Sequence, residues 1–222
     1  MNHEINSAAY WDWRFGSGDW ALRRGHMQTR QFTEAQLPRL RLPRVFTGSL
    51  CDFGCGAGDA FPVYRAAWPR ARLYGVDISP AAIALCRERC GQFGEFRSGD
   101  VDAVPNCDVV VCSNVLEHLD DDREVVRRLL EKCTTLFVIV PYREQHLIAE
   151  HRRAYDRRSF AAFAPRRSEV FTCRGWSEYG RLLYLDIHLK NVPRLLLGRS
   201  LRRRNRQLLV EIAGSGDKAG GR

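Results

Sequence analysis

The sequence predicts an α/β fold in which a mostly parallel sheet carries helices on both faces. Short apolar runs recur along the chain, and segments with helical signals separate them. This alternation is typical of parallel strands joined by crossover helices. The 222 residues suit one domain with a full core, and a hydrophobic content of 45% is that of a globular protein.

The expected strands are the apolar runs themselves. The first ends at Asp52 and the second, from Leu73, ends at Asp77, so two neighbouring strands each finish on a carboxylate. Apolar runs bounded by turn signals suit strands that are buried on both faces. Later strands are expected from Asp108 onward and over Leu136–Tyr142, Glu169–Cys173 and Gln207–Ile212.

Helix signals fall between these runs. Pro62 suits the first turn of a helix over Phe61–Trp68, and Pro69 ends that helix. Ser79 can cap a helix over Pro80–Cys90. Further helices are expected over Gln28–Ala35, Arg123–Lys132 and Ser159–Phe163. Pro38 and Pro43 mark the run from the first of these into the first strand. Asp120–Asp122 place negative charge at the start of the second, which favours the helix dipole.

A glycine-rich turn follows the first strand. The stretch Ser49–Phe61 reads SLCDFGCGAGDAF, with glycines at 54, 56 and 58. Glycine admits a ligand close to the backbone, and the free N–H groups of a helix start favour polar or anionic groups. A nucleotide-like ligand is therefore expected across this turn, although glycines can also serve turn geometry alone.

The spacing of the glycines restricts the class of ligand that this turn can bind. A dinucleotide loop needs G-x-G-x-x-G or a final Ala, but Asp59 or Phe61 stands at the last position. A phosphate loop needs Lys-Ser or Lys-Thr after its glycines, and neither pair follows. What remains, D-x-G-x-G-x-G, resembles motif I of the class I S-adenosylmethionine-dependent methyltransferases.

Other motifs of that family follow in order. The second strand of that family is resembled by LYGVD at 73–77, which places Asp77 to accept hydrogen bonds from a ribose diol. Its adenine-edge motif is resembled by SGDV at 98–101, which places Asp100 near the exocyclic amine. Its fourth strand and the turn beneath the methyl donor are resembled by DVVVCSNVLEHL at 108–119. The resemblance implies one Rossmann-like, doubly wound sheet of seven strands with an antiparallel strand seven. It also implies S-adenosylmethionine as cofactor, held by Asp52, Gly54, Cys55, Gly56, Gly58, Asp77, Ile78, Asp100, Val101 and Asn114.

Three segments are expected along the chain. Residues 1–44 crowd aromatic side chains around Gly16–Gly18 and resemble the helical lid of small-molecule methyltransferases, although such aromatics can equally pack a helix on the sheet edge. Residues 45–213 form the methyltransferase domain. Residues 214–222 form a Gly-rich tail that is expected to be disordered.

The predicted catalytic residues are His118 and His151, which follow strands four and five. Ligands of open α/β sheets bind at the carboxyl ends of strands, and histidine has the intrinsic pKa of a general base near neutrality. The pair Glu117–His118 has a structural alternative, in which it only starts the helix after strand four. Some metal-using members of the family carry E-x-x-E-H and a further His; here Asn114 replaces the first Glu, so no metal is expected.

The acceptor is expected to be a hydroxyl of a small molecule or a glycan, a class that includes phosphate-bearing and lipid-linked acceptors. The N-P-P-Y type signature for exocyclic amines is absent, since SNVL stands there, so nucleic acid is an unexpected acceptor. Two alternatives stay open: methylation of a macromolecule, RNA or protein, and cofactor binding without catalysis.

Charge divides the chain. Up to Val140 there are 17 Lys plus Arg against 18 Asp plus Glu, whereas from Pro141 onward there are 18 against 8. The basic part suggests an anionic substrate, a membrane surface or nucleic acid, or merely a solvated face. Within Arg194–Arg206, leucines alternate with arginines, so this stretch is either a membrane-surface segment or a connector into strand seven.

The location is expected to be cytoplasmic. The first residues lack a basic segment followed by an apolar one, so no secretory signal is expected, and no apolar run reaches the length of a bilayer span. The eight cysteines include no C-x-x-C pair and are expected to be reduced.

Overall fold

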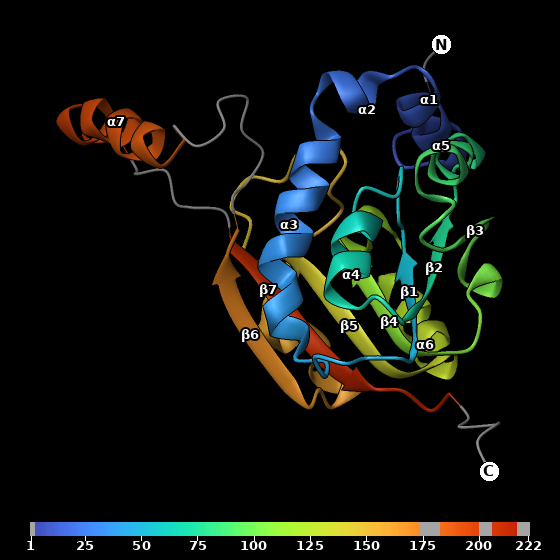
Figure 1. The fold of residues 1–222 in the computed structure, drawn as a ribbon. Coiled ribbons are helices and arrows are strands. Elements are labelled where there is room, and N and C mark those ends of the chain that lie inside the picture. Colours follow the sequence, from blue (N-terminus) through green and yellow to red (C-terminus); the bar gives the residue numbers. More distant parts are fainter. Residues whose placement is uncertain (1–2, 174–182, 200–205, 217–222) are drawn as a thin grey trace.

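A seven-stranded sheet forms the centre of the molecule (Figure 1). The computed structural model describes residues 3–173, 183–199 and 206–216. The strand order is β3-β2-β1-β4-β5-β7-β6. The strands are β1 (Ser49–Phe53), β2 (Arg72–Asp77), β3 (Glu95–Ser98), β4 (Cys107–Ser113), β5 (Cys133–Pro141), β6 (Arg167–Thr172) and β7 (Arg206–Ala213). Strand β7 runs antiparallel to both neighbours, which confirms the predicted sheet.

Strand β1 lies between β2 and β4 and is buried along its whole length. It pairs in parallel with both neighbours, so Leu50 lies opposite Leu73 on one side and Val109 on the other. An apolar run can be buried in this way because both faces of a parallel sheet are covered. The carboxyl ends of β1, β2 and β4 therefore meet at one edge of the sheet, where ligands of such folds bind.

Helices cover both faces of the sheet (Figure 1). The helices are α1 (Ala8–Gly16), α2 (Asp19–Leu22), α3 (Gly25–Leu40), α4 (Phe61–Ala67), α5 (Pro80–Cys90), α6 (Asp122–Glu131) and α7 (Leu183–Leu196), with 3-10 turns η1 (Val101–Ala103), η2 (Leu116–His118) and η3 (Arg157–Phe163). Side chains of α3, α4 and α5 pack on one face of the sheet. Side chains of α6 and η3 pack on the other, so two cores sandwich the sheet.

The local signals for α4 and α5 predict their starts correctly. Ser79 accepts a hydrogen bond at Oγ from the backbone N–H of Ala82 at 3.0 Å, and Pro80 opens α5. Pro62 lies in the first turn of α4, and that helix ends at Ala67, before Pro69. These caps fix where each helix begins relative to the strand before it.

The proline in α3 departs from the sequence prediction. The helix continues through Pro38 to Leu40, whereas a helix over Gln28–Ala35 was expected. Pro38 forfeits one backbone hydrogen bond to the preceding turn. Leu40, which is 2% exposed, belongs to the core beneath α3, so tertiary packing carries the helix past the proline.

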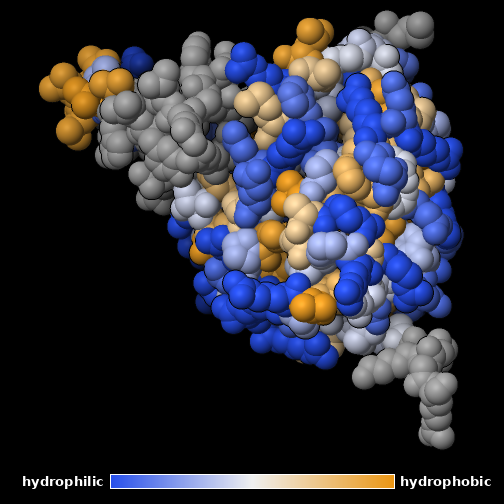
Figure 2. Space-filling view, viewed as in Figure 1, coloured by the Kyte–Doolittle hydropathy of each residue, from blue (hydrophilic) through white to orange (hydrophobic). Residues whose placement is uncertain are grey.

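Helix α7 lies in the connection between β6 and β7 and extends away from the sheet (Figure 1). Residues 174–182, which precede α7 in the chain, lie outside the described residues. Apolar residues gather on the described part of α7 (Figure 2). Among the described helices, none combines the length and the apolar character that a bilayer crossing demands.

The chain remains hydrogen-bonded beyond β7. Backbone N–H groups of Gly214 and Gly216 donate to the carbonyls of Thr134 and Cys133, and that of Ser215 donates to Leu130. The first three residues of the segment expected to be a disordered tail are thus joined to the start of β5 and the end of α6. Residues 217–222 lie outside the described part. All eight cysteines are free thiols.

Candidate active site

One cavity of about 1330 Å³ opens at the carboxyl edge of the sheet. Its lining includes residues from the turns after β1, β2, β3 and β4, from the N-terminal helices and from the loop after β5. Nine of the ten predicted cofactor residues line this cavity: Asp52, Gly54, Cys55, Gly56, Asp77, Ile78, Asp100, Val101 and Asn114. Both predicted catalytic histidines, His118 and His151, line it as well.

The glycine turn after β1 needs its glycines for two different reasons. Gly54 has φ +78, and a Cβ there would lie 2.2 Å from Cγ2 of Val115. Gly56 has φ +53, and its Cβ would lie 3.2 Å from the Phe15 ring on the cavity side. Side chains at these positions would therefore strain the turn and crowd the cavity.

Gly58 is the predicted cofactor residue that does not line the cavity. A Cβ there would lie 3.0 Å from Sγ of Cys86, and its carbonyl accepts a hydrogen bond from Sγ of Cys90 at 3.5 Å. The structure therefore places Gly58 against α5, where it allows close packing of the turn on that helix.

Asp77 ties the glycine turn to the start of α5. Its Oδ2 accepts from the backbone N–H of Gly56 at 2.8 Å, and its Oδ1 accepts from that of Ser79 at 2.9 Å. Burial raises the pKa of this carboxyl, although the two backbone hydrogen bonds oppose the rise. The side chain thus holds two backbone segments of the cavity wall while lining the cavity itself.

The other carboxylates of this end differ in environment. Asp52 is buried within β1, and burial, followed by the charge of Asp77, raises its pKa to about 8. Asp100 accepts a hydrogen bond from the backbone N–H of Asp102 at 2.9 Å and so caps η1. This cap fixes the turn after β3, in which Asp100 and Val101 line the cavity.

A polar network at the cavity wall includes Asn114. This residue has φ +55; its Oδ1 accepts from Nε2 of Gln207 at 2.9 Å, and its Nδ2 donates to Oγ of Ser113 at 3.0 Å. Gln36 donates from Nε2 to Ser113 and to Oε1 of Gln207, each at 2.9 Å. Gln36, Ser113 and Gln207 all line the cavity, and sequence reasoning missed them because α3, β4 and β7 lie far apart in the chain.

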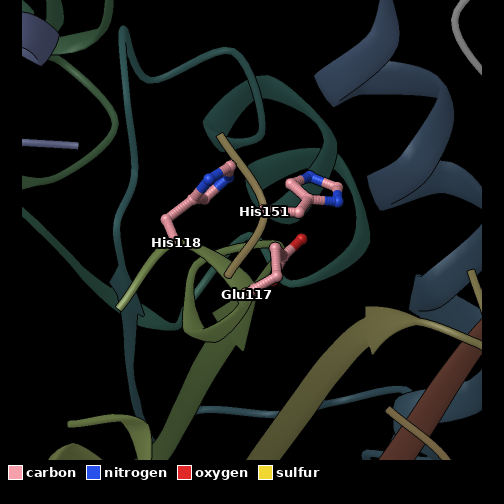
Figure 3. A group of neighbouring side chains, drawn as sticks. All are labelled: Glu117, His118 and His151. Atoms are coloured by element: carbon pink, nitrogen blue, oxygen red, sulfur yellow. The ribbon is translucent and has the colours of Figure 1, made fainter. Parts of the chain in front are cut away.

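Glu117, His118 and His151 converge at the cavity (Figure 3). Their ligand atoms lie within 4.8 Å of one another. The two imidazole rings have centroids 5.0 Å apart and an interplanar angle of 69°. The turn η2 supplies the first two residues, and the loop after β5 supplies the third. The two predicted catalytic histidines are therefore neighbours.

Each histidine is held through Nδ1. His118 places Nδ1 3.0 Å from the backbone oxygen of Glu150, and His151 places Nδ1 2.5 Å from a carboxylate oxygen of Glu144. A carbonyl oxygen only accepts, so Nδ1 of His118 carries the proton and its Nε2 carries a free electron pair. A carboxylate partner fixes the orientation of His151 in the same way.

Burial shifts the titration of this group. It raises the pKa of Glu117 to about 8, and it lowers the pKa of His118 to about 4. Burial also lowers the pKa of His151, but the hydrogen bond to Glu144 and the charges of Glu117, Glu144 and Glu150 outweigh it, so the net pKa is raised. His118 is therefore neutral at pH 7, whereas His151 binds a proton more tightly.

Helix α1 spans the cavity from one rim to the other. On one side, Oδ1 of Asp12 accepts from Oγ of Ser79 at 3.0 Å and from the backbone N–H of Ala81 at 2.8 Å. On the other, the hydroxyl of Tyr10 donates to Oε1 of Glu150 at 2.9 Å. Between them, the Trp11 ring meets His118 edge-on at 5.1 Å. The helix therefore links the start of α5 to the loop after β5.

Basic side chains line the cavity near the ends of β5 and β7. The guanidinium groups of Arg206 and Arg143 lie 5.0 and 5.5 Å from the centroid of the Tyr142 ring. His146 and Arg194 also line the cavity. The basic C-terminal part of the sequence thus contributes positive charge to the cavity, which the sequence alone could not place there.

The comparisons with known proteins agree with this geometry. The family model of a methyltransferase domain matches residues 51–135, which run from β1 to β5. These comparisons support a class I S-adenosylmethionine-dependent methyltransferase, and with it S-adenosylmethionine as the cofactor. The matched region contains the glycine turn, Asp77 and the pair Glu117–His118.

Curated relatives match the same part of this methyltransferase. A trans-aconitate 2-methyltransferase of Escherichia coli is 32% identical over 92 residues, which are 40% of this chain and 36% of that protein. One of Rhodococcus jostii is 35% identical over 77 residues, which are 35% of this chain and 30% of that protein. The chain thus spans about a third of the length of these relatives.

Solved structures share the fold over most of the chain. A putative methyltransferase in complex with the Haloferax volcanii Trm112 methyltransferase activator has a TM-score of 0.67 at 18% identity, covering 96% of this chain and all of that one. A phosphoethanolamine N-methyltransferase of Haemonchus contortus, solved with phosphomonomethylethanolamine and S-adenosylhomocysteine, has a TM-score of 0.62 at 12% identity, covering 94% and 60%. At these identities the likeness concerns the fold.

Proposed function

We propose that this methyltransferase methylates an oxygen of a small acceptor molecule. The observation that carries the proposal is that one cavity is lined both by the glycine turn with Asp77 and by the cluster of Glu117, His118 and His151. When bound, S-adenosylmethionine supplies an electrophilic methyl group. The chain must then orient the acceptor and promote loss of its proton.

The residues of the cofactor end fit that cofactor. Positive φ at Gly54 and Gly56 leaves backbone without Cβ atoms facing the cavity. The carboxylate of Asp77 accepts one backbone hydrogen bond on each oxygen, so each oxygen has an electron pair left for a ribose hydroxyl. We assign Asp100 and Val101 to the adenine end. The assignment of all these cavity-lining residues to the cofactor is part of the proposal.

His118 and His151 act on the acceptor. Both direct Nδ1 toward an acceptor on the protein, so their Nε2 atoms are the groups left to meet a hydroxyl. Of the two histidines, without a metal ion, His151 is the stronger base because Glu144 stabilises its protonated form. Helix α1, which places Trp11 against His118, serves as the lid that excludes water.

The acceptor is a small anionic molecule in this proposal. Arg143, Arg206 and His146 line the cavity near Tyr142, and positive charge attracts carboxylate or phosphate groups. The similarity to trans-aconitate 2-methyltransferases supports a carboxylate-bearing acceptor. A glycan hydroxyl, the other acceptor expected from the sequence, lacks such support.

A membrane contact extends the proposal to acceptors at a lipid surface. Leu189, Val192 and Leu196 are spaced to share one face of α7, and they are 66%, 56% and 81% exposed. No Asp or Glu occurs between Asp186 and Glu211. Exposed leucines in a basic part of the sequence favour an anionic membrane surface.

Labelled methyl transfer tests the activity. The chain would be incubated with S-adenosylmethionine bearing a trideuterated methyl group and a panel that includes trans-aconitate, citrate and uncharged sugars. Mass spectrometry should find the label on an anionic acceptor, and Gly56→Val should abolish it. Labelling of sugars alone would overturn the anionic class, and failure to bind S-adenosylmethionine would overturn the whole proposal.

A further inference from the structure

We propose that Glu117, His118 and His151 bind a divalent first-row transition-metal ion. The three side chains come from η2 and from the loop after β5, and they are neighbours at the cavity (Figure 3). The departure of Asn114 from the metal-using sequence pattern argued against a metal. The arrangement of the side chains argues for one, on grounds that do not depend on that pattern.

The separations suit a single ion. The ligand atoms of the three side chains lie within 4.8 Å of one another. Nitrogen and oxygen ligands lie about 2.1 Å from such ions, so two atoms bound to one ion are at most about 4.2 Å apart. Side-chain rotations that move the atoms by less than about 1 Å therefore close the site.

Both histidines are already oriented as ligands. His118 is held at Nδ1 by the backbone oxygen of Glu150, and His151 is held at Nδ1 by the carboxylate of Glu144. Metal-bound histidines typically donate their other ring N–H to a carbonyl or a carboxylate in this manner. Each Nε2 is left with an electron pair for the ion.

Glu117 supplies the third ligand. Its side chain is 1% exposed, and Oε2 has no hydrogen-bond partner among the described residues. A buried carboxyl oxygen without a partner is unfavourable, and buried polar atoms are nearly always paired. A cation between Glu117 and the two imidazoles would satisfy this oxygen.

The donor set indicates the class of metal. Two imidazoles and one carboxylate suit Mn²⁺, Fe²⁺, Co²⁺, Ni²⁺ or Zn²⁺, whereas Mg²⁺ and Ca²⁺ favour oxygen donors. Asn114 does not add a ligand, because its amide is engaged with Gln207 and Ser113. Three protein ligands leave positions open for water or for an acceptor oxygen.

The ion would change how the histidines act, a consequence that rests on the proposed methyl transfer. A dication held there would make a nearby acceptor hydroxyl more acidic, so that its proton could leave to water. His118 and His151 would then hold the ion rather than take the proton themselves. Direct proton transfer to His151 is the route without metal.

Metal binding can be measured without cofactor or acceptor. Tag-free chain would be stripped with chelator and titrated with Mn²⁺, with free Mn²⁺ followed by electron paramagnetic resonance, and with Zn²⁺ by calorimetry. We expect one ion per chain. Glu117→Gln and His151→Ala should each weaken binding at least about tenfold, and Glu144→Gln about 10–100-fold. His26→Ala, which changes a histidine of α3 outside the cluster, should bind as the wild type does.

Each outcome separates the metal from the proposed function. No stoichiometric binding of Mn²⁺ or Zn²⁺ by the wild type, or equal binding by the Glu117 and Glu144 variants, would overturn the site. S-adenosylmethionine affinity, measured on every variant, shows that it has folded. If labelled methyl transfer persists in chelator, the methyltransferase proposal stands and the metal proposal is overturned. If the chain binds metal but transfers no methyl group, the metal proposal stands and the methyltransferase proposal is overturned.

Discussion

His118 and Glu150 are joined through the ring nitrogen Nδ1 of the histidine, which lies 3.0 Å from the backbone oxygen of Glu150. Because the carbonyl accepts the Nδ1 proton, His118 presents Nε2 to the cavity. We expect His118→Ala and His151→Ala each to lower the rate of methyl transfer roughly 10²–10⁴-fold while S-adenosylmethionine affinity is kept. Single-turnover kinetics and calorimetry measure the two quantities. Near wild-type turnover in both variants would show that neither histidine activates the acceptor.

Substitutions at Asp77 and Gly56 should weaken cofactor binding. Asp77→Ala removes the acceptor of two backbone hydrogen bonds and of the proposed ribose contact, so we expect a loss of about 1–3 kcal/mol in binding. Gly56→Val should lose more, because its φ of +53 strains any side chain. Calorimetry with S-adenosylmethionine decides. Asp102→Ala, which changes an exposed carboxylate near Asp100, serves as the control; unchanged affinity in both test variants would refute the cofactor assignment.

Local signals explain why so much of the fold was predictable. The Ser79–Pro80 cap and the glycine turn each lie within a few residues, and short-range sterics and hydrogen bonds determine their form. Pro38 shows the limit: its own preference predicts a helix end, whereas packing of Leu40 in the core extends the helix.

The candidate site was predictable only in part, for a related reason. The glycine turn and Asp77 follow strand ends, so sequence position locates them. The contact of Gln36 with Gln207 spans 171 residues, and that of Tyr10 with Glu150 spans 140. These pairs depend on where α3, β7 and α1 pack, which no local signal specifies.

Arg14 should contribute to the stability of the lid. Its side chain is 7% exposed; its Nε lies 2.7 Å from Asp19, and its Nη1 lies 3.1 Å from Glu150. Arg14→Ala leaves both carboxylates without this partner, so we expect the free energy of unfolding to fall by about 1–3 kcal/mol. Urea denaturation measures it. Arg23→Ala removes a 60% exposed partner of the same Asp19 and should change stability by less than about 1 kcal/mol; equal losses would contradict a special role for Arg14.

Asp52 gives the stability of the protein a specific pH dependence. Its pKa is about 8 in the folded chain, because of burial and the charge of Asp77, against 3.8 ordinarily. Between these values the unfolded chain releases the proton and the folded chain keeps it, so this contribution to stability is complete below about pH 4 and is lost as pH rises toward 8. Asp52→Asn cannot ionise. Its free energy of unfolding relative to the wild type should therefore rise with pH across this window.

Asp108 supplies a control of opposite sign for that experiment. Burial opposes ionisation of this carboxyl, but hydrogen bonds from Ser49 and the charge of Arg72 outweigh it and lower the pKa. The stabilising contribution of Asp108 is thus present above its ordinary pKa and is lost in acid. Asp108→Asn should lose stability at neutral pH relative to the wild type. Parallel pH profiles for the Asp52 and Asp108 variants would exclude the proposed effect of burial at Asp52.

We predict that α7 binds anionic membranes through its exposed leucines. Leu195 and Leu196 are 69% and 81% exposed, and basic residues without intervening acids surround them in the sequence. We expect the wild type to co-sediment with vesicles of anionic lipid and to dissociate as salt rises, since near the surface each Lys or Arg adds about 1 kcal/mol. Replacing both leucines with Ser should reduce binding at low salt. Changing Arg202–Arg204, which lie outside the described residues, to Gln should also weaken vesicle binding.

Matched substitutions at other exposed apolar residues complete the vesicle experiment. Leu22 and Val45 are 84% and 73% exposed, yet they lie in α2 and before β1 rather than in the basic part of the chain. Leu22→Ser and Val45→Ser should therefore leave vesicle binding unchanged. If the wild type stays in the supernatant at low salt, α7 does not bind lipid. Its leucines would then serve the connection between β6 and β7, and the positive charge near Arg143 and Arg206 would act only on a dissolved acceptor.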